Sequence, residues 1–267
     1  MQRRNRPELM DQPHVEEGEL ATDLRNLAWI NRLLGGIAVI RAHLPREVRG
    51  QGSGVRGQDV LSAVGCRPAA VSRGRRVLTD SRQATADSTS HLAASPLTVL
   101  DVATGGGDIP RWLARRRVEL IAGDLHPQML QLARKWSAGL PIRFIRCDAR
   151  RLPFRDRSVD VVLCSLMLHH LTEADAVQAL RELGRVPRRR LIVNDLRRSR
   201  VAYVLIWLIT RFSRNRLTRC DSPASVERAF TPAELEALAR AAGLDRRGSF
   251  RLYRHLYYRM ALVYEPK

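Results

Sequence analysis

Residues Val99 to Asp108 read VLDVATGGGD, an apolar run that ends in three consecutive glycines and an acidic residue. Such a run before a helical pattern predicts a buried strand that passes directly into a helix. Glycine lets the backbone turn tightly and approach a ligand closely, beside the first N–H groups of the helix. The spacing matches neither G-x-G-x-x-G nor a P-loop, so a dinucleotide pyrophosphate site is disfavoured. A tight connection that binds nothing is the alternative.

Acidic side chains also follow the next two predicted strands. Asp124 follows the apolar run 118–123 and lies 17 positions after Gly107, and Asp148 follows the run 142–145. At that distance an acidic side chain can accept hydrogen bonds from ribose hydroxyls, while Asp148 can accept one from an adenine amine. Because parallel strands end at one edge of a sheet, the three ends together predict a single site for a nucleotide-like cofactor.

Apolar runs and helical patterns alternate regularly from Leu97 onward, which is typical of βαβ units. The final segment, 248–264, reads as two antiparallel strands. We therefore predict an α/β fold, a doubly wound, mostly parallel seven-stranded sheet. Its first five strands are predicted at 97–102, 118–123, 142–145, 159–164 and 191–193.

The sequence divides into three parts. Residues 1–44 form an N-terminal helical segment, because leucines and isoleucines recur at helical spacing across 17–36. Residues 45–96 are rich in Gly, Ser, Arg and Gln, and this composition predicts a disordered insertion. Residues 97–267 form the main domain, with a lid or substrate helix region at 201–230.

The composition limits the class of protein. The chain has 267 residues with 46 basic and 27 acidic side chains, a formal net charge of +19, which raises the alternative of an RNA-binding enzyme. Its four cysteines fit no C-x-x-C metal site, and no metal is expected. No apolar run approaches the roughly 20 residues that span a bilayer, and no secretory signal is visible. We expect a cytoplasmic protein, with contact to the inner membrane face as a further option.

Beyond the glycine turn, the sequence resembles the class I S-adenosylmethionine-dependent methyltransferases over about Leu97–Val193. The small-molecule branch, with the menaquinone and ubiquinone C-methyltransferases and many O-methyltransferases, is the most similar. The segments that carry this resemblance are 148–154 (DARRLPF), 158–162 (SVDVV) and 168–171 (LHHL). More loosely, the flanks resemble bacterial methyltransferases associated with polyketide-type phenolic lipids, through the segments 7–11, 194–199 and 225–231.

The resemblance implies a Rossmann-like methyltransferase fold with S-adenosyl-L-methionine as cofactor. The methionine end would lie on the first strand and its turn, the ribose on Asp124 and the adenine on Asp148, with Leu125 packed on the adenine face. One departure is Ala103, where the family usually has glycine, and this methyl group could shift the methionine end. The implied cofactor-binding residues are Asp101, Ala103, Thr104, Gly105, Gly107, Asp124, Leu125, Asp148, Ala149 and Ser165.

Methyl transfer from a sulfonium needs an aligned nucleophile, and a base where the acceptor carries a proton. His169 or His170, after the fourth strand, is the candidate base because imidazole titrates near neutrality. A purely structural role for this histidine pair is the alternative.

The apolar segment after the fifth strand is expected to select the acceptor. Tyr203 and Trp207 are the candidates for an aromatic or lipidic acceptor, and Asn194 for lining its pocket. The segment 201–219 could instead lie on a membrane surface with its arginines at the headgroups, or pack against the N-terminal helix.

We therefore predict a methyltransferase that acts on oxygen, or carbon, of a small lipophilic phenol, quinol or polyketide, with no specific nucleic-acid partner. An RNA methyltransferase and a non-catalytic cofactor-binding module are the alternatives. The acceptor and the oligomeric state stay open.

Overall fold

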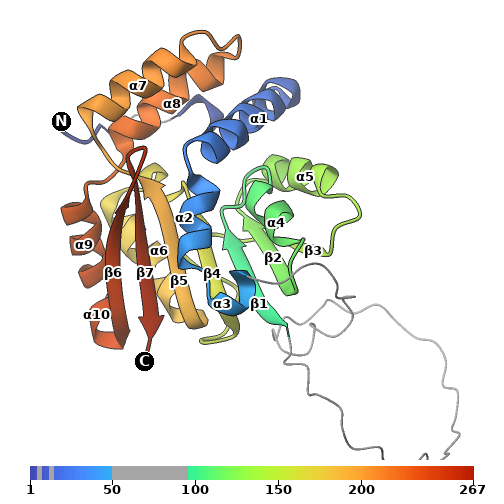
Figure 1. The fold of residues 1–267 in the computed structure, drawn as a ribbon, viewed down its shortest axis with the longest axis vertical. Helices are drawn as coiled ribbons and strands as arrows, with labels where there is room; N and C mark the ends of the chain where they lie inside the picture. The colour runs from blue at the N-terminus through green and yellow to red at the C-terminus, as the bar shows by residue number, and fades with distance from the viewer. Residues whose placement is uncertain (5–7, 12–14, 50–95) are drawn as a thin grey trace, which may run out of the picture.

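The structure, a computed structural model, describes residues 1–4, 8–11, 15–49 and 96–267. Its centre is a seven-stranded sheet in the order β3-β2-β1-β4-β5-β7-β6, shown in Figure 1. The first five strands are parallel, β7 runs antiparallel to β5, and β6 runs antiparallel to β7. The strands are β1 (Leu97–Val102), β2 (Val118–Asp124), β3 (Ile142–Arg146), β4 (Val159–Ser165), β5 (Pro187–Leu196), β6 (Gly248–His255) and β7 (Arg259–Pro266). The predicted doubly wound, mostly parallel sheet is confirmed.

Strand β5 is much longer than the strand predicted at 191–193, where the sequence has a short apolar run. Arginines at positions 188–190 precede that run and Asn194-Asp195 follow it. These polar residues break the apolar pattern, although they still pair with β4 and β7. The register therefore carries Asn194 and Asp195 to the carboxyl edge of the sheet, beside the end of β4.

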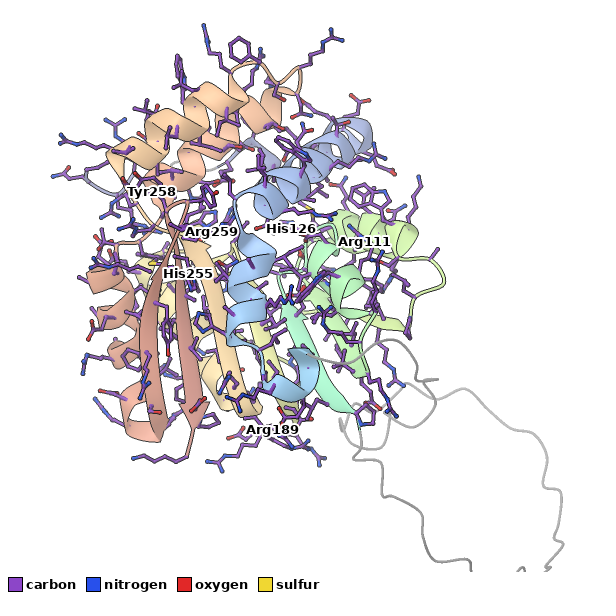
Figure 2. The ribbon with its side chains drawn as sticks, in the orientation of Figure 1. Arg111, His126, Arg189, His255, Tyr258 and Arg259 are labelled. Carbon is purple, nitrogen blue, oxygen red and sulfur yellow. The ribbon has the colours of Figure 1, made fainter. Side chains whose placement is uncertain are left out.

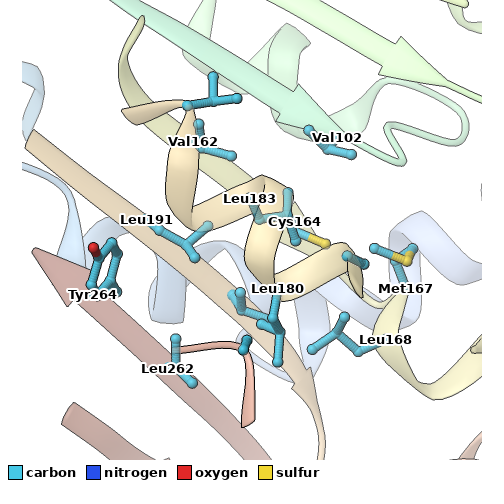
Figure 3. Packing of buried hydrophobic residues seen from close by; sticks show 14 of the residues in the cluster. Val102, Val162, Cys164, Met167, Leu168, Leu180, Leu183, Leu191, Leu262 and Tyr264 are labelled. Carbon is cyan, nitrogen blue, oxygen red and sulfur yellow. The ribbon is translucent and has the colours of Figure 1, made fainter. Parts of the chain in front are cut away.

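Helices cover both faces of the sheet. Because side chains alternate along a strand, Leu100 and Val102 face one layer, with α6, α9 and α10, while Val99 faces the other layer, with α2 and α4. Figure 3 shows the first core, in which Leu180 and Leu183 of α6 pack against Val162 and Leu191. The helices of the main domain are α4 (Asp108–Leu113), α5 (Pro127–Trp136), α6 (Glu173–Arg185), α7 (Arg200–Thr210), α8 (Arg216–Arg228), α9 (Pro232–Ala241) and α10 (Leu244–Arg247), with the 3-10 helix η2 (Leu168–His170).

The chain reverses its winding at β1, and this reversal fixes where a ligand can bind. From β1 it proceeds through β2 to β3 on one side, and β4 and β5 then lie on the other side. In open α/β sheets ligands bind in the crevice beyond the carboxyl ends of the strands at such a reversal. The site is therefore expected beyond the ends of β1 and β4.

The N-terminal part forms several helices, η1 (Leu9–Asp11), α1 (Glu17–Leu33), α2 (Gly36–His43) and α3 (Arg46–Arg49). Gly35 separates α1 from α2 at φ 74°, a conformation that glycine adopts readily. Helix α2 packs on the sheet, and α1 continues beyond its carboxyl edge to contact α8, as Figure 1 shows. The predicted insertion 45–96 begins too early, because residues 46–49 form α3 and Val48 packs in the core. Residues 50–95 lie outside the described residues, so the assignment stays a prediction for them.

The predicted lid region 201–230 contains two helices, α7 and α8, which pack against each other. Ser199 and Asn215 cap their N-termini through side-chain oxygens. Helix α9 begins with a capping box formed by Thr231 and Glu234. Within the described residues, no helix is long and apolar enough to cross a membrane.

Candidate functional site

The glycine turn after β1 has an unusual backbone. Gly105 and Gly107 adopt φ of 51° and 74°, and Ala103 adopts φ 59°. A non-glycine residue in this left-handed region costs about 1–2 kcal/mol. The departure from the family pattern noted at Ala103 therefore falls on a position whose conformation favours glycine.

Asp101, at the end of β1, lies under this turn. Its Oδ2 accepts a hydrogen bond from Thr104 Oγ1 at 2.7 Å, whereas its buried Oδ1 has no hydrogen-bond partner among the residues that the structure describes. Burial raises the pKa of Asp101 to about 8, with the charges of Asp108 and Asp124 acting in the same direction. An unpaired buried carboxylate oxygen is costly, and a cationic ligand group would satisfy it. The ammonium of a bound methionine moiety fits this requirement.

Asp124 ends β2 and is oriented by the backbone. Its Oδ2 accepts the N–H of Gly105 and its Oδ1 the N–H of His126, both at 2.9 Å. Burial raises the pKa of Asp124, and these backbone hydrogen bonds oppose that shift. Each carboxylate oxygen has more than one lone pair, so both can still accept ribose hydroxyls. The residues present at β1 and β2 therefore fit S-adenosylmethionine.

Asp148 follows β3 and forms an ion pair within its own turn. Arg150 Nη2 lies 2.7 Å from Asp148 Oδ2, and the hydrogen bond from Arg150 lowers the pKa of Asp148. Ala149 belongs to the same turn, and Leu125 after β2 is exposed. The structure thus places these residues at the same edge as Asp124, and their contacts with adenine stay a prediction.

A cavity of about 940 Å³ opens beside the glycine turn. This volume lies within the range of small-molecule sites. From the predicted cofactor set, Ala103, Thr104, Gly105 and Ser165 line it, whereas Asp101, Gly107, Asp124, Leu125, Asp148 and Ala149 do not. Its other walls come from α1, α7, α8 and the β6–β7 turn. The cavity therefore joins the methionine end of the predicted cofactor site to a mostly apolar chamber.

Helix α7 borders this cavity, but the residues that line it are not the two predicted to contact the acceptor. Ala202, Leu205, Ile206 and Ile209 line it, and neither Tyr203 nor Trp207 does. At about 100° per residue, 202, 205, 206 and 209 share one helix face, which leaves both aromatic side chains off it. Asn194 does not line the cavity either.

Asn194 lies next to the cavity wall. Its Nδ2 is 3.4 Å from Oγ of Ser165, and its buried Oδ1 has no hydrogen-bond partner.

Both predicted base candidates line the cavity, and His169 is held by a carboxylate. Nδ1 of His169 lies 2.6 Å from Oδ1 of Asp195, and the His169 backbone N–H donates to Oδ2 of the same residue at 3.2 Å. Although burial raises the pKa of Asp195, the nearby His169 holds it below its ordinary value. When Asp195 accepts a hydrogen bond from Nδ1–H, Nε2 is the ring nitrogen that can act as a base.

Glu8 enters the site from the N-terminal segment. Its Oε1 lies 3.9 Å from His169 Nε2 and its Oε2 lies 3.8 Å from His170 Nε2. Ser225 Oγ donates to Oε1 at 2.8 Å. Asp221 of α8 anchors this segment by accepting the backbone N–H groups of Leu9 and Met10, each at 2.9 Å. A buried carboxylate thereby faces the same ring edge that would take a proton.

Glu8, His169 and His170 also offer ligand atoms that lie within 4.8 Å of one another, so they could hold a divalent cation. Nη1 of Arg228 is 3.8 Å from Glu8 Oε1, however, and already places a positive charge there. The guanidinium also donates to the carbonyl oxygens of His169 and His170. This charge disfavours a cation there, and a role of the cluster in proton transfer stays a prediction.

Several site residues have no local sequence signal. Glu8 is one acidic residue in a polar segment, and Asn31 lies within an amphipathic helix pattern. Asn31 nevertheless lines the cavity, and its Nδ2 lies 3.2 Å from Asp108 Oδ2. Asp195 differs from these two residues, because its position just after a predicted strand could have pointed to the site.

Comparison with known proteins agrees with this geometry. Residues 99–190 match a family described as a methyltransferase domain. The chain is 34% identical to a demethylmenaquinone methyltransferase from Thermus thermophilus over 171 residues, which cover 58% of this chain and 77% of that protein. It is 44% identical to a demethylmenaquinone methyltransferase from Deinococcus radiodurans over 110 residues, which cover 39% of this chain and only 45% of that protein.

A solved structure shares the fold. The crystal structure of a Pyrococcus horikoshii protein aligns with a TM-score of 0.50 at 20% identity, covering 66% of this chain and 84% of that one. At this identity the likeness concerns the fold alone, and it supports the Rossmann-like architecture.

Proposed function

The chain belongs to the class I S-adenosylmethionine-dependent methyltransferases, and we propose that it transfers a methyl group to a lipophilic phenol or quinol. Two of its relatives act, by their names, on demethylmenaquinone. The match covers less than half of the Deinococcus protein. The proposal for the acceptor therefore rests on the residues that line the cavity.

The cavity carries the proposal for a lipophilic acceptor. Apolar side chains from α1, α7 and the β6–β7 turn form most of its walls, among them Leu27, Leu205 and Ile209. Burial of apolar surface contributes roughly 25 cal/mol per Å², so an alkyl or isoprenoid chain would be favoured there. The cavity also reaches the glycine turn and His169, which lets one end of the acceptor approach the methyl donor.

His169 is the proposed base. When bound, the cofactor supplies a methyl group that its sulfonium charge already activates, so the protein must mainly align the acceptor and remove its proton. His169 Nε2 takes the proton of a phenolic hydroxyl, and Asp195 stabilises the resulting imidazolium across the 2.6 Å contact. Glu8, 3.9 Å from the same Nε2, adds a second negative charge.

This arrangement serves methylation at oxygen directly. Removing the phenolic proton also enriches the ring carbons in electrons, so the same base would assist methylation at carbon. Relatives of both kinds match, including a ubiquinone biosynthesis O-methyltransferase from Cupriavidus pinatubonensis at 31% identity over 59% of its length. We therefore propose an ionisable hydroxyl on the acceptor and leave the choice of methylated atom to experiment.

The outer face of α7 is the proposed contact with a membrane surface. Val201, Val204, Trp207 and Leu208 are exposed there, and Phe212, just after the end of the helix, is exposed by 88%. Exposed arginines flank them at positions 200, 211, 214, 216 and 219. Apolar side chains bordered by arginines fit an anionic lipid surface, where each arginine contributes about 1 kcal/mol. Leu205 and Ile209, which line the cavity, are exposed on the same helix, so a lipid-borne acceptor could enter from this side.

An RNA acceptor gains no support. The walls of the cavity are mainly apolar, and the relatives described above are not named as RNA enzymes. Binding to RNA through phosphates would weaken steeply with salt, which gives the alternative a clear signature.

The experiment that tests the function uses S-adenosylmethionine with a labelled methyl group. The protein is incubated with a panel of alkylphenols and prenylated quinols, and separately with RNA. The proposal predicts label in one of the small molecules, with loss of label in His169→Gln. Label in RNA alone, or label in a phenol that His169→Gln leaves unchanged, would contradict it.

A further inference from the structure

Arg259 is the first residue of β7, and its side chain reaches the cavity. It is 2% exposed and lines the cavity together with Arg197 and Tyr258. Figure 2 labels Arg259 at the upper end of β7, where the hairpin approaches α1 and α2. The register places it opposite Leu196, the last residue of β5.

Within the described part of the chain, no carboxylate forms an ion pair with the guanidinium of Arg259. Its Nε and Nη1 are buried and have no hydrogen-bond partner among the described residues. Two carboxylates act on it through space, Asp195 and Asp108, yet burial outweighs them and lowers the pKa of Arg259 to about 10. Asp195 is already bonded to His169, and Asp108 accepts from Asn31. The nearest acids are therefore engaged elsewhere.

A buried charge without a partner is strongly unfavourable in a folded protein. Arginine at a binding site presents a planar set of donors that matches a carboxylate or another oxyanion. Arg259 lines the cavity, and Nη2 is the one guanidinium nitrogen that is not among its buried, unpartnered atoms, so an anionic group in the cavity would meet the guanidinium through Nη2.

Building on the proposed function, we propose that Arg259 binds an anionic oxygen group of the acceptor, a carboxylate or a phenolate. The acceptor would thus be an acidic lipophilic phenol, such as an alkylated hydroxybenzoate, rather than a neutral one. Its charged end would lie beside His169 and Arg259 and its alkyl chain against α1 and α7.

The position of the strand favours the acceptor over the cofactor as the source of this anion. In the order β1-β4-β5-β7, three steps separate β7 from the strand that carries the glycine turn. Neighbouring strands are about 4.8 Å apart, so the backbone of Arg259 lies roughly 14 Å from β1, although the charge of Asp108, directly after the glycine turn, still acts on the guanidinium. It adjoins β5 instead, which carries Asp195 and so holds His169.

The test compares 4-pentylbenzoate with 4-pentylbenzamide, two probes of similar shape that differ in charge. Binding is measured by calorimetry on the full chain saturated with S-adenosylhomocysteine, for the unaltered protein, Arg259→Met and Arg259→Lys. Arg254→Met is the matched control, because it removes the same charge from an exposed position on the neighbouring strand. Failure of S-adenosylhomocysteine to bind at all would count against the proposed function, before the probes are used.

We expect the unaltered protein and Arg254→Met to prefer the benzoate about 10- to 100-fold, the range for a hydrogen-bonded charge. Arg259→Met should lose this preference, and Arg259→Lys should retain part of it. Arg259→Met should also melt at a higher temperature without ligand, because the unpaired buried charge is gone. The proposal is overturned if the unaltered protein does not discriminate or if Arg259→Met keeps the preference. It is also overturned if Arg259→Met weakens S-adenosylhomocysteine but not 5′-methylthioadenosine, since the guanidinium would then serve the cofactor carboxylate.

Discussion

Oδ1 of Asp195 lies 2.6 Å from Nδ1 of His169, and both side chains are buried where β5 and the 3-10 helix after β4 meet. The contact holds the ring through Nδ1, while Nε2 lies 3.9 Å from Oε1 of Glu8. Asp195 lies at the carboxyl edge of the sheet, and through this contact it holds the proposed base.

The first prediction concerns this pair. Asp195→Asn should lower kcat by about 100-fold and leave the affinity for S-adenosylhomocysteine unchanged, because the base loses its orientation while the cofactor site stays intact. His169→Gln should lower kcat at least as much. His170→Gln is the control, with a smaller effect expected. A change in cofactor affinity with kcat preserved would show that the pair is structural only.

The second prediction concerns Asp101, whose pKa burial raises to about 8 in the folded protein. Between about pH 4 and pH 8 the folded chain then holds a proton that the unfolded chain has lost, so this group makes the free energy of unfolding fall as pH rises. Asp101→Asn should flatten that dependence and stabilise the unliganded protein at pH 8. The measurement is urea unfolding across this range, and an unchanged slope would contradict the assignment.

The third prediction concerns Ala103. Its φ of 59° favours glycine, so Ala103→Gly should raise the free energy of unfolding by about 1 kcal/mol. Ala114→Gly serves as the control, because Ala114 adopts a right-handed helical conformation and glycine there should destabilise the protein. Denaturant unfolding of both variants decides the point. If Ala103→Gly lowers the free energy of unfolding, the prediction is wrong. The contacts of the Ala103 methyl group would then stabilise the protein by more than the left-handed backbone costs.

The fourth prediction concerns the outer face of α7. Replacing Val204, Leu208 and Phe212 together by serine should weaken binding to vesicles of anionic phospholipid by at least about 10-fold, because apolar contact with the lipid is lost. The melting temperature should barely change, since all three side chains are exposed. Leu140→Ser, at an exposed apolar residue of the loop after α5, is the control. Equal binding of the variant and the unaltered chain would exclude this face as the contact.

The sequence predicted the elements whose apolar runs are bounded by turn residues. β1 begins and ends at the predicted residues, 97 and 102. The carboxylates at the ends of β2 and β3 lie at the predicted edge, because parallel order follows from alternating strands and helices.

The acceptor side could not be predicted in the same way. Glu8 reaches His169 only because Asp221, far away in sequence, anchors the N-terminal segment. Arg259 is one of many arginines, and only the packing of the hairpin shows that it is buried. Tyr203 and Trp207 were singled out by residue type, whereas the phase of the helix around its axis decides which side chains line the cavity.

If the ends of β1, β2 and β3 bind one adenosyl cofactor, the protein binds S-adenosylhomocysteine at a single site. Calorimetric titration measures this binding most directly. We predict saturable binding with one site per chain, weakened about 10- to 100-fold in Asp124→Asn, which removes the charge that accepts the ribose hydroxyls. No saturable heat with the unaltered protein, or equal affinity in Asp124→Asn, would contradict the account.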